Sequence, residues 1–267
     1  FCTFSAMGRL RAEASVAQNR RMSANPNRFM LWHAWIPFAA FAALAILLST
    51  TDLDLRIADH FFYDFEAARW VGKDTWWARN VLHTGGRNVM RAAGIFGLLA
   101  LGASYVAPLA RRWPALVRQR RPLGFFVACV AIVPLIVGSL KQVTNVDCPW
   151  DLAHYGGERP FVHIFEDRPD DLPRAACFPG AHSSSGFALL GLYFLGLARS
   201  RRHALTGLAI GIGVGSLFSF AQQARGAHFL SHDLWSAFIA WGICLALYRY
   251  AWRENVNPAA PSPDSSR

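Results

Sequence analysis

The sequence predicts an all-α polytopic membrane protein, a six-transmembrane-helix bundle, and three observations support this fold class. Only 16% of the 267 residues are charged and 53% are hydrophobic, whereas a soluble domain usually carries about a quarter charged residues. The apolar residues gather in six stretches of about the length that a bilayer requires. Lys and Arg alternate in density between these stretches. The composition therefore argues against a water-soluble globular enzyme.

The six apolar stretches contain no Lys, Arg or Glu, and they cover residues 31–49, 92–110, 123–140, 181–198, 204–221 and 229–248. The first is predicted to be an uncleaved membrane anchor, because it is longer than a signal-peptide core and lacks a small-residue cleavage pattern. The fourth and sixth begin with polar residues, which predicts helices whose outer ends open into an aqueous site. The small-residue run 207–215 predicts close helix packing.

The connections between the stretches form two sets by charge. Residues 1–30, 111–122, 199–203 and 249–267 carry 16 basic and 3 acidic residues, and residues 50–91, 141–182 and 222–233 carry 11 basic and 14 acidic ones. Because Lys and Arg concentrate on the cytoplasmic side, both termini are predicted inside and the other three loops outside, in the periplasm of a bacterial inner membrane. The net charge of +10 then reflects topology, and nucleic acid is not expected as a partner.

One membrane domain is predicted between two cytoplasmic ends. Residues 1–29 form a basic N-terminal segment that is expected to be partly non-native or disordered, and residues 30–250 form the six-helix domain. Residues 251–267 are rich in Pro and Ser and are expected to be a disordered tail.

The first outer loop is predicted to lie as an amphipathic segment on the outer membrane surface, where aromatic residues anchor it. Its polar and aromatic residues are Asp52, Asp54, Asp59, His60, Trp70, Trp76, Trp77 and His83.

The second outer loop brings ionisable residues to two helix ends. Lys141 ends the third apolar stretch, and FPGAHSSSG begins the fourth. Pro179 and Gly180 stop the loop, and the helix that starts at Ala181 would present free N–H groups and a positive dipole end to an anion such as phosphate. His182, in its first turn, would donate a proton to a leaving oxygen. The alternative is that Ser183 to Ser185 only cap the helix.

The third outer segment, ARGAHFLSHDLWS, enters the last apolar stretch. His228 and His232 are four residues apart and would share a helix face, with Asp233 beside them and Arg225 one turn earlier. Because an ionisable group within a membrane costs about 2.5–3.5 kcal/mol, this cluster should face the bundle interior or a water-filled cavity. The two histidines also allow a zinc site, but Phe229 stands where a base Glu would be, and no third ligand is evident. No metal or other cofactor is therefore expected.

Lys141, His182 and His228, in that order at three helix ends, resemble the three motifs of the type 2 phosphatidic acid phosphatase and vanadium haloperoxidase superfamily. The first motif, Lys, six residues, Arg-Pro, reads here from Lys141 to Cys148-Pro149. The second, Pro-Ser-Gly-His, reads Pro179-Gly180-Ala181-His182. The third, Ser-Arg, five residues, His, three residues, Asp, reads Ala221-Gln222, His228 and His232.

The resemblance implies a membrane phosphatase in which His228 attacks phosphorus to give a phosphohistidine and His182 protonates the leaving group. Lys141 would neutralise the phosphoryl oxygens, and Gly180, Ala181 and Ser183 at the helix start would bind them. Both motif arginines are missing, replaced by Cys148 and Gln222. Arg225 is the first candidate to replace them, because an Arg fork binds phosphate with two donors.

Two further assignments stay open at this stage. Asp233, or His232 itself, would orient the nucleophilic histidine. Arg159 and Arg174 are weaker candidates for phosphate binding than Arg225.

Five cysteines can be divided by location. Cys129 and Cys244 lie within apolar stretches and are expected to be packing residues, and Cys2 lies in the N-terminal segment. Cys148 and Cys177 flank the second outer loop in an oxidising compartment, so we hypothesise a disulfide that clamps this loop.

The expected function is hydrolysis of a lipid phosphomonoester or diphosphate on the extracytoplasmic face. Helix ends at the bilayer surface can take the headgroup while the lipid tails stay in the membrane. The resembled family acts on phosphatidate, phosphatidylglycerophosphate, polyprenyl diphosphate and lipid A phosphates. The alternatives are a lipid phosphotransferase of the same fold, or a non-catalytic membrane transporter or binding relative.

Overall fold

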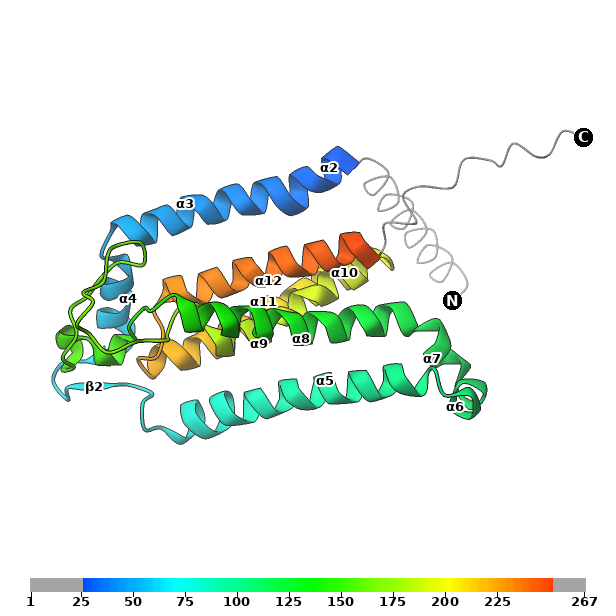
Figure 1. Ribbon diagram of the computed structural model, residues 1–267, viewed down its shortest axis with the longest axis horizontal. Coiled ribbons are helices and arrows are strands. Elements are labelled where there is room, and N and C mark those ends of the chain that lie inside the picture. Colours follow the sequence, from blue (N-terminus) through cyan, green and yellow to red (C-terminus); the bar gives the residue numbers. More distant parts are fainter. Residues whose placement is uncertain (1–25, 252–267) are drawn as a thin grey trace, which may run out of the picture.

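The structure, a computed structural model, describes residues 26–251 and is all-α apart from one short hairpin (Figure 1). The predictions for the N-terminal segment up to residue 25, including Cys2, and for the tail from residue 252 lie outside the described residues. The helical elements in chain order are α2 (Pro26–Met30), a π-helical stretch (Leu31–Trp35), α3 (Ile36–Thr50), α4 (Leu53–Phe61), a second π-helical stretch (Trp77–Gly85), α5 (Gly86–Ala103), α6 (Ala107–Arg112), α7 (Pro114–Arg118), α8 (Arg120–Val143), α9 (Ala181–Phe187), α10 (Gly191–Leu197), α11 (Arg201–Ala224) and α12 (Leu230–Ala251). Short 3-10 turns cover Pro149–Asp151, Ala153–Tyr155 and Ala188–Leu190.

Four of the predicted membrane stretches are long apolar helices. Within residues 26–251, the helices Pro26–Thr50, Arg120–Val143, Arg201–Ala224 and Leu230–Ala251 have the length and hydropathy to cross a membrane. They correspond to the first, third, fifth and sixth stretches. Four apolar helices of this kind are typical of a membrane protein.

The second and fourth stretches are helical but differ from the prediction. The prediction of one continuous helix over 92–110 is wrong, because α5 ends at Ala103 and α6 begins at Ala107 after a turn. Pro108 explains the break, since proline lacks an N–H and is favoured in the first turn of a new helix. The fourth stretch is divided into α9, the 3-10 turn Ala188–Leu190 and α10.

Small residues of α11 pack against the fourth stretch, as the sequence predicts. A Cβ atom at Gly211 would lie 2.6 Å from the backbone nitrogen of Leu190. Gly207 and Gly215 lie one turn to either side. A Cβ atom at Gly207 would likewise be too close to Leu192, and one at Gly215 too close to Phe187. The four-residue spacing therefore lets α11 approach α9 and α10 closely. Cys129 and Cys244 are fully buried in the core between α8, α9, α10 and α12, which confirms their packing role.

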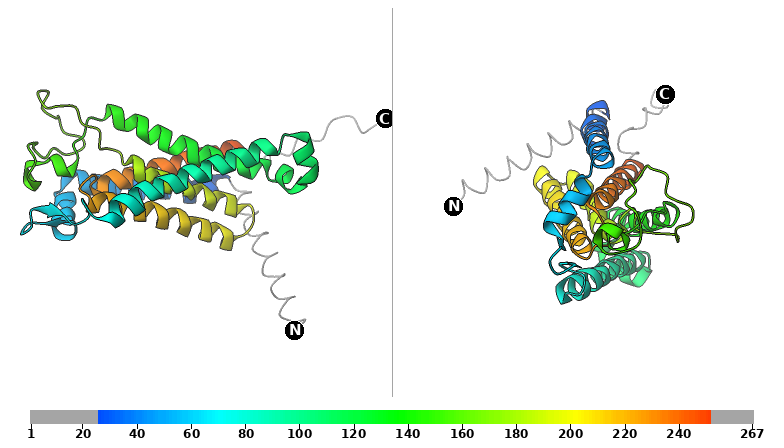
Figure 2. Two further views of the ribbon diagram at one scale, coloured as in Figure 1. Left: turned by 90° about the horizontal axis from the view of Figure 1, so that it is seen from below. Right: turned by 90° about the vertical axis from the view of Figure 1, so that its left-hand side faces the viewer.

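The loops that carry the candidate chemistry lie together at one end of the bundle, and we call this the outer end. Figure 1 shows α4, the hairpin β1 (Tyr63–Asp64) and β2 (Arg69–Trp70), and the loop after α8 at this end, with α6 and α7 at the other. The right-hand view of Figure 2 looks at the bundle from the outer end and shows α3 and α5 on opposite sides, with the remaining long helices between them. The turn between α11 and α12 lies there too, since the carbonyl of Gly226 accepts a hydrogen bond from the N–H of Trp150. The fold therefore gathers three sequence-distant loops into one region.

A second apolar cluster covers the outer end. It contains Ala58, Phe62, Tyr63, Trp70, Leu152, Tyr155, Ala224 and Phe229. Trp70 is only 4% exposed, so its predicted role as a surface anchor is wrong. It packs against Gly226, whose φ of +73° is favourable only for glycine. Trp76 is 72% exposed, and its role at the membrane surface stays a prediction.

Candidate active site

His228 and Asp233 form a buried pair at the start of α12. His228 lies in the turn between α11 and α12, and Asp233 lies in the first turn of α12. Nδ1 of His228 is 2.8 Å from Oδ1 of Asp233, and their side chains are 1% and 2% exposed. The carboxylate accepts the hydrogen bond, so Nδ1 carries the proton and Nε2 presents its lone pair. This tautomer has the nitrogen that a nucleophile or a general base requires.

Asp233, and not His232, is the partner of His228. The ring centroids of His228 and His232 are 6.0 Å apart, and Nδ1 of His232 has no hydrogen-bond partner among the described residues. Asp233 stands one residue later than the motif spacing expects. The turn accommodates this residue, because His228 precedes the helix, which begins at Leu230.

Gln223 completes the environment of Asp233, and no motif in the sequence points to it. Its Nε2 donates a hydrogen bond of 3.1 Å to Oδ2 of Asp233. Both carboxylate oxygens are therefore engaged, which holds the carboxylate in one orientation. A glutamine at the end of an apolar helix, next to the motif position Gln222, is the signal that could have identified it.

Gly180 packs directly on this pair. Its N–H donates to the carbonyl of His232, and its own carbonyl accepts hydrogen bonds from the hydroxyls of Ser183 and Ser236. A Cβ atom at Gly180 would lie 2.5 Å from Oδ1 of Asp233 and 2.8 Å from Nδ1 of His228. Only glycine leaves room for the pair, so the contribution of Gly180 is close approach.

Replacing Gly180 with Ala is expected to lower turnover by about 10²-fold, because a displacement of about 1 Å at a reacting group costs that much. The added methyl group also overpacks the core, at a cost of about 1–3 kcal/mol in the free energy of unfolding. Gly213→Ala is the matched control, since a Cβ atom there meets nothing within 4 Å. Phosphate release and thermal unfolding of both variants in detergent test this, and equal activity in the two variants would contradict it.

His182 lies beside the first outer loop. It belongs to the first turn of α9, where its ring stacks on Phe218 with centroids 4.6 Å apart. Its Nε2 is 3.2 Å from the carbonyl of Leu82, and its ring centroid is 4.8 Å from that of His83. The 77–85 segment therefore forms one wall of the region around His182.

Several positive groups converge on His83. Burial is the main cause that lowers its pKa to about 4, and the charges of Arg225, Arg87, His228 and Lys141 lower it further. Positive charges so close together favour an anion between them. The sequence predicts Lys141 and Arg225 as candidates, whereas it predicts membrane anchoring for His83 and gives no motif signal for Arg87.

Arg225 is held in place by the residue that replaces a motif arginine. Its Nη1 donates to Oε1 of Gln222 at 2.6 Å, while its Nε is buried without a hydrogen-bond partner in residues 26–251. Burial lowers the pKa of Arg225, and the charge of Arg79 lowers it further. A guanidinium with one unused donor and no carboxylate partner among the described residues is suited to an anionic ligand.

The serines of α9 do not cap its N-terminus. The hydroxyls of Ser183, Ser184 and Ser185 donate to the carbonyls of Gly180, Ala181 and His182, three residues back in each case. The interpretation of these serines as N-caps is therefore wrong. Ser183 is buried, and it is hydrogen-bonded to Gly180, which packs on the His228–Asp233 pair.

The second outer loop is held by covalent and ionic links. Cys148 and Cys177 are joined by a disulfide. Burial would raise the pKa of Asp147, but hydrogen bonds from Arg168 and Arg159 outweigh it and lower the pKa. Arg174 donates to the backbone carbonyl of Gln142. Arg159 and Arg174 are thus engaged within the loop.

The sequence also allows a zinc site at His228 and His232. In the part of the chain that the structure describes, no group of three or more His, Cys, Asp or Glu residues is arranged to hold a metal ion.

A sequence model of the PAP2 superfamily matches residues 122–255, about half of the chain. The matched range contains Lys141, His182, His228 and Asp233. No curated protein and no solved structure matches the chain.

Proposed function

The chain belongs to the PAP2 superfamily, and from this premise we propose that it is an integral-membrane phosphatase that hydrolyses a lipid phosphate. Membership of this superfamily indicates phosphatase activity. The observation that carries the finer proposal is the buried His228–Asp233 pair, which lies near the positive groups around His83 at the outer end of apolar helices. A nucleophilic nitrogen next to an anion site is the arrangement that phosphoryl transfer requires.

The proposed reaction passes through a phosphohistidine. Nε2 of His228 attacks phosphorus, so that a P–N bond forms as the P–O bond to the lipid breaks, and His182 gives a proton to the leaving oxygen. A water molecule then attacks phosphorus and breaks the P–N bond, and His182 takes up the proton of that water. The products are the dephosphorylated lipid and inorganic phosphate. Asp233 stabilises the positive charge on the His228 ring during each attack.

Lys141 and Arg225 are proposed to bind the phosphoryl oxygens, with Ala181 and Ser183 beside them at the start of α9. Gly180 has the positioning role described above. Because Asp233 is engaged by His228 and Gln223, positive groups dominate the rest of the site. This balance favours a dianionic phosphomonoester or a diphosphate over a neutral group.

Arg225→Gln is expected to lower kcat/KM by about 10–100-fold, since a hydrogen bond to a charged group contributes about 1.5–3 kcal/mol. Arg225→Lys should recover only part of this loss, because a point charge cannot reproduce the two-donor fork. Arg56→Gln, an exposed arginine of α4, is the matched control. Steady-state phosphate release measures all three, and an unchanged kcat/KM in Arg225→Gln would exclude this role.

The proposed topology has six membrane-spanning segments, with α5 and the α9–α10 segment completing the four apolar helices. Both termini are then cytoplasmic and the site is periplasmic, in a bacterial inner membrane. The charge alternation of the loops supports this orientation. A tag fused to the C-terminus that reports the side of the membrane on which it lies tests this orientation. An extracytoplasmic C-terminus would refute the proposed topology.

A lipid substrate is proposed because the site lies at the ends of apolar helices. The phosphate can reach His228 from the headgroup layer while the tails stay between lipids. Phosphatidate, phosphatidylglycerophosphate, polyprenyl diphosphate and lipid A phosphates all meet this requirement.

The test is phosphate release by the purified protein in detergent, across a panel of these lipids, with a chelator present. We expect release from at least one lipid that persists with the chelator. Release that needs an added acceptor would instead indicate a phosphotransferase. Binding of the lipids without release or transfer would indicate a non-catalytic relative.

A further inference from the structure

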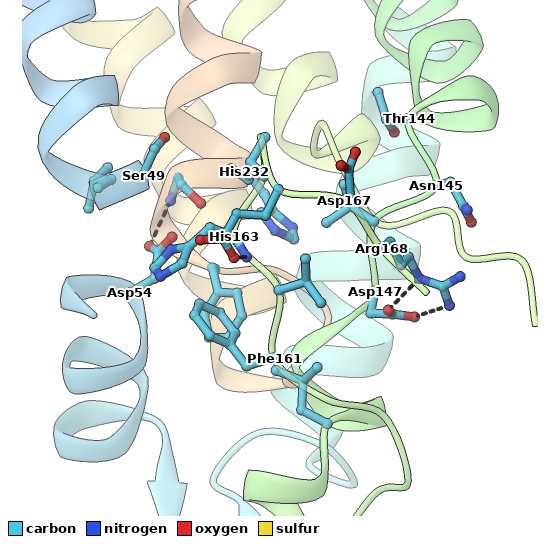
Figure 3. A pocket seen from close by; sticks show the side chains of 18 residues that line it. Ser49, Asp54, Thr144, Asn145, Asp147, Phe161, His163, Asp167, Arg168 and His232 are labelled. Atoms are coloured by element: carbon cyan, nitrogen blue, oxygen red, sulfur yellow. Dashed lines mark hydrogen bonds and ion pairs between the residues drawn. The ribbon is translucent and has the colours of Figure 1, made fainter. Parts of the chain in front are cut away.

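A cavity of about 230 Å³ lies at the outer end, next to the candidate active site. It is bounded by the last turn of α3, the start of α4, the loop after α8 and the first turn of α12 (Figure 3). Because α3, α8 and α12 belong to membrane-length helices, their shared end corresponds to the headgroup layer in the proposed topology. The volume is several times the roughly 30 Å³ of one liquid water molecule, so it can hold a small polar group.

One buried polar atom in the wall of this cavity lacks a hydrogen-bond partner among the described residues. It is Nδ1 of His232, a residue that is only 1% exposed. Because an unpaired buried polar atom is unfavourable, a ligand that hydrogen-bonds with this nitrogen gains affinity. The next residue, Asp233, holds His228, so the same helical turn serves both the cavity and the candidate nucleophile.

The charge of the cavity is opposite to that of the phosphate region. Its wall contains four carboxylates and one arginine, and the arginine, Arg168, is bound to Asp147. This leaves Asp54, Glu166 and Asp167, which have no Lys or Arg partner among the described residues. Figure 3 shows Asp54 on one side of the cavity and the Asp147–Arg168 pair on the other, with His163 and His232 between them. A second phosphate is disfavoured here, and a cation is favoured.

Asp54 is the buried member of this acidic group. It is 6% exposed, and it accepts a hydrogen bond of 3.0 Å from the backbone N–H of Ser231 at the start of α12. Burial is the main cause that raises the pKa of Asp54, and the neighbouring Ser231 offsets only part of this rise. A positive ligand would stabilise this carboxylate, while a neutral one would not.

We propose that this cavity binds a primary ammonium group carried by the headgroup of a lipid. Together with the proposed function, on which this part rests, it narrows the substrate class to lipid phosphates that also bear an amine. His232 lines the cavity, and its ring centroid is 6.0 Å from that of His228. The cavity therefore adjoins the proposed phosphate site.

The test measures binding and does not depend on turnover. The probes are lysophosphatidylethanolamine and its N-acetylated form, which differ in the charged amine and carry a phosphodiester in place of a cleavable terminal phosphate. We expect the wild-type protein to bind the amine form at least about tenfold more tightly, which corresponds to one charge-assisted hydrogen bond. Equal dissociation constants for the two probes would overturn the proposal.

Variants locate the effect in the cavity. Asp54→Asn keeps an acceptor oxygen for the Ser231 N–H, and the double variant Glu166→Gln/Asp167→Asn changes only exposed side chains. Both should remove most of the preference for the amine, whereas Glu158→Gln, an exposed carboxylate that does not line the cavity, should keep it. A preference that survives in both cavity variants would overturn the proposal.

Two further comparisons identify the source of the amine and distinguish the ammonium site from the proposed phosphatase function. Free ethanolamine that displaces the probe as well as the lipid does would identify a soluble amine as the ligand in place of a lipid headgroup. Amine preference without phosphate release from any lipid would reject the proposed function and keep the ammonium site. Phosphate release with no amine preference would keep the proposed function and reject the ammonium site.

Discussion

Replacing His228 with Ala is expected to lower phosphate release by about 10⁴-fold or more, because the variant lacks the nitrogen that forms the bond to phosphorus. The binding of the lipid should change far less, since Lys141 and Arg225 still hold the phosphate. Initial rates with a lipid phosphate in detergent, together with binding of the same lipid to the variant, measure the two effects separately.

The control for this variant is His60→Ala, an exposed histidine at the same end of the bundle that lies outside the candidate site. It should keep the wild-type rate. Acid-labile phosphate bound to the wild-type protein after rapid quenching, and absent from His228→Ala, would identify the intermediate. Full activity of a folded His228→Ala protein would exclude the phosphohistidine mechanism.

Asp233→Asn is expected to lower phosphate release by about 10³-fold with little change in binding. Asparagine keeps the shape of the side chain but removes the charge that fixes the proton on Nδ1 of His228 and stabilises the cationic ring. The amide of Gln223, which donates to Oδ2 at 3.1 Å, would also lose its acceptor if the nitrogen of the new side-chain amide faced it. The rate constant kcat and the Michaelis constant KM together test this, because the loss should fall on kcat.

His232→Asn provides the contrast for Asp233. His232 occupies the position at which the resembled motif has Asp, so a greater loss in His232→Asn than in Asp233→Asn would assign the orienting role to His232. We expect the opposite order, because of the two only Asp233 is hydrogen-bonded to His228. Thermal unfolding of both variants ensures that the comparison is made between folded proteins.

The helices could be predicted from the sequence to different degrees. Apolar stretches of membrane length identified α3, α8, α11 and α12. A helix that crosses a bilayer needs a minimum number of consecutive apolar residues, and such a run can be read directly from the sequence. The break at Ser104 to Val106 was missed, since hydropathy does not respond to the backbone geometry that Pro108 imposes. The sequence also gives no signal for the 3-10 turn Ala188–Leu190 that separates α9 from α10, because this turn is as apolar as the helices around it.

The candidate site could be predicted in its outline only. Lys141, His182 and His228 stood out because ionisable residues at the ends of apolar stretches need a reason to be there. The partner of His228 stayed open, since Asp233 and His232 are adjacent and spacing cannot say which one the turn directs inward. His83, Arg79 and Gln223 gave no motif signal, and they reach the site only because the 77–85 segment and the end of α11 pack there.

Hydrophobic length and loop charge are properties of the chain, and they suffice to predict a bundle of membrane helices with its ionisable residues gathered at one end. The folded arrangement was needed to show which carboxylate holds His228, that Gly180 must lack a side chain, and that a carboxylate-lined cavity adjoins a region of positive charge. These features depend on contacts between residues far apart in the chain, such as Asp54 with Ser231 and Gly180 with Asp233. Such contacts arise from packing of the helices against one another, which local sequence patterns do not specify.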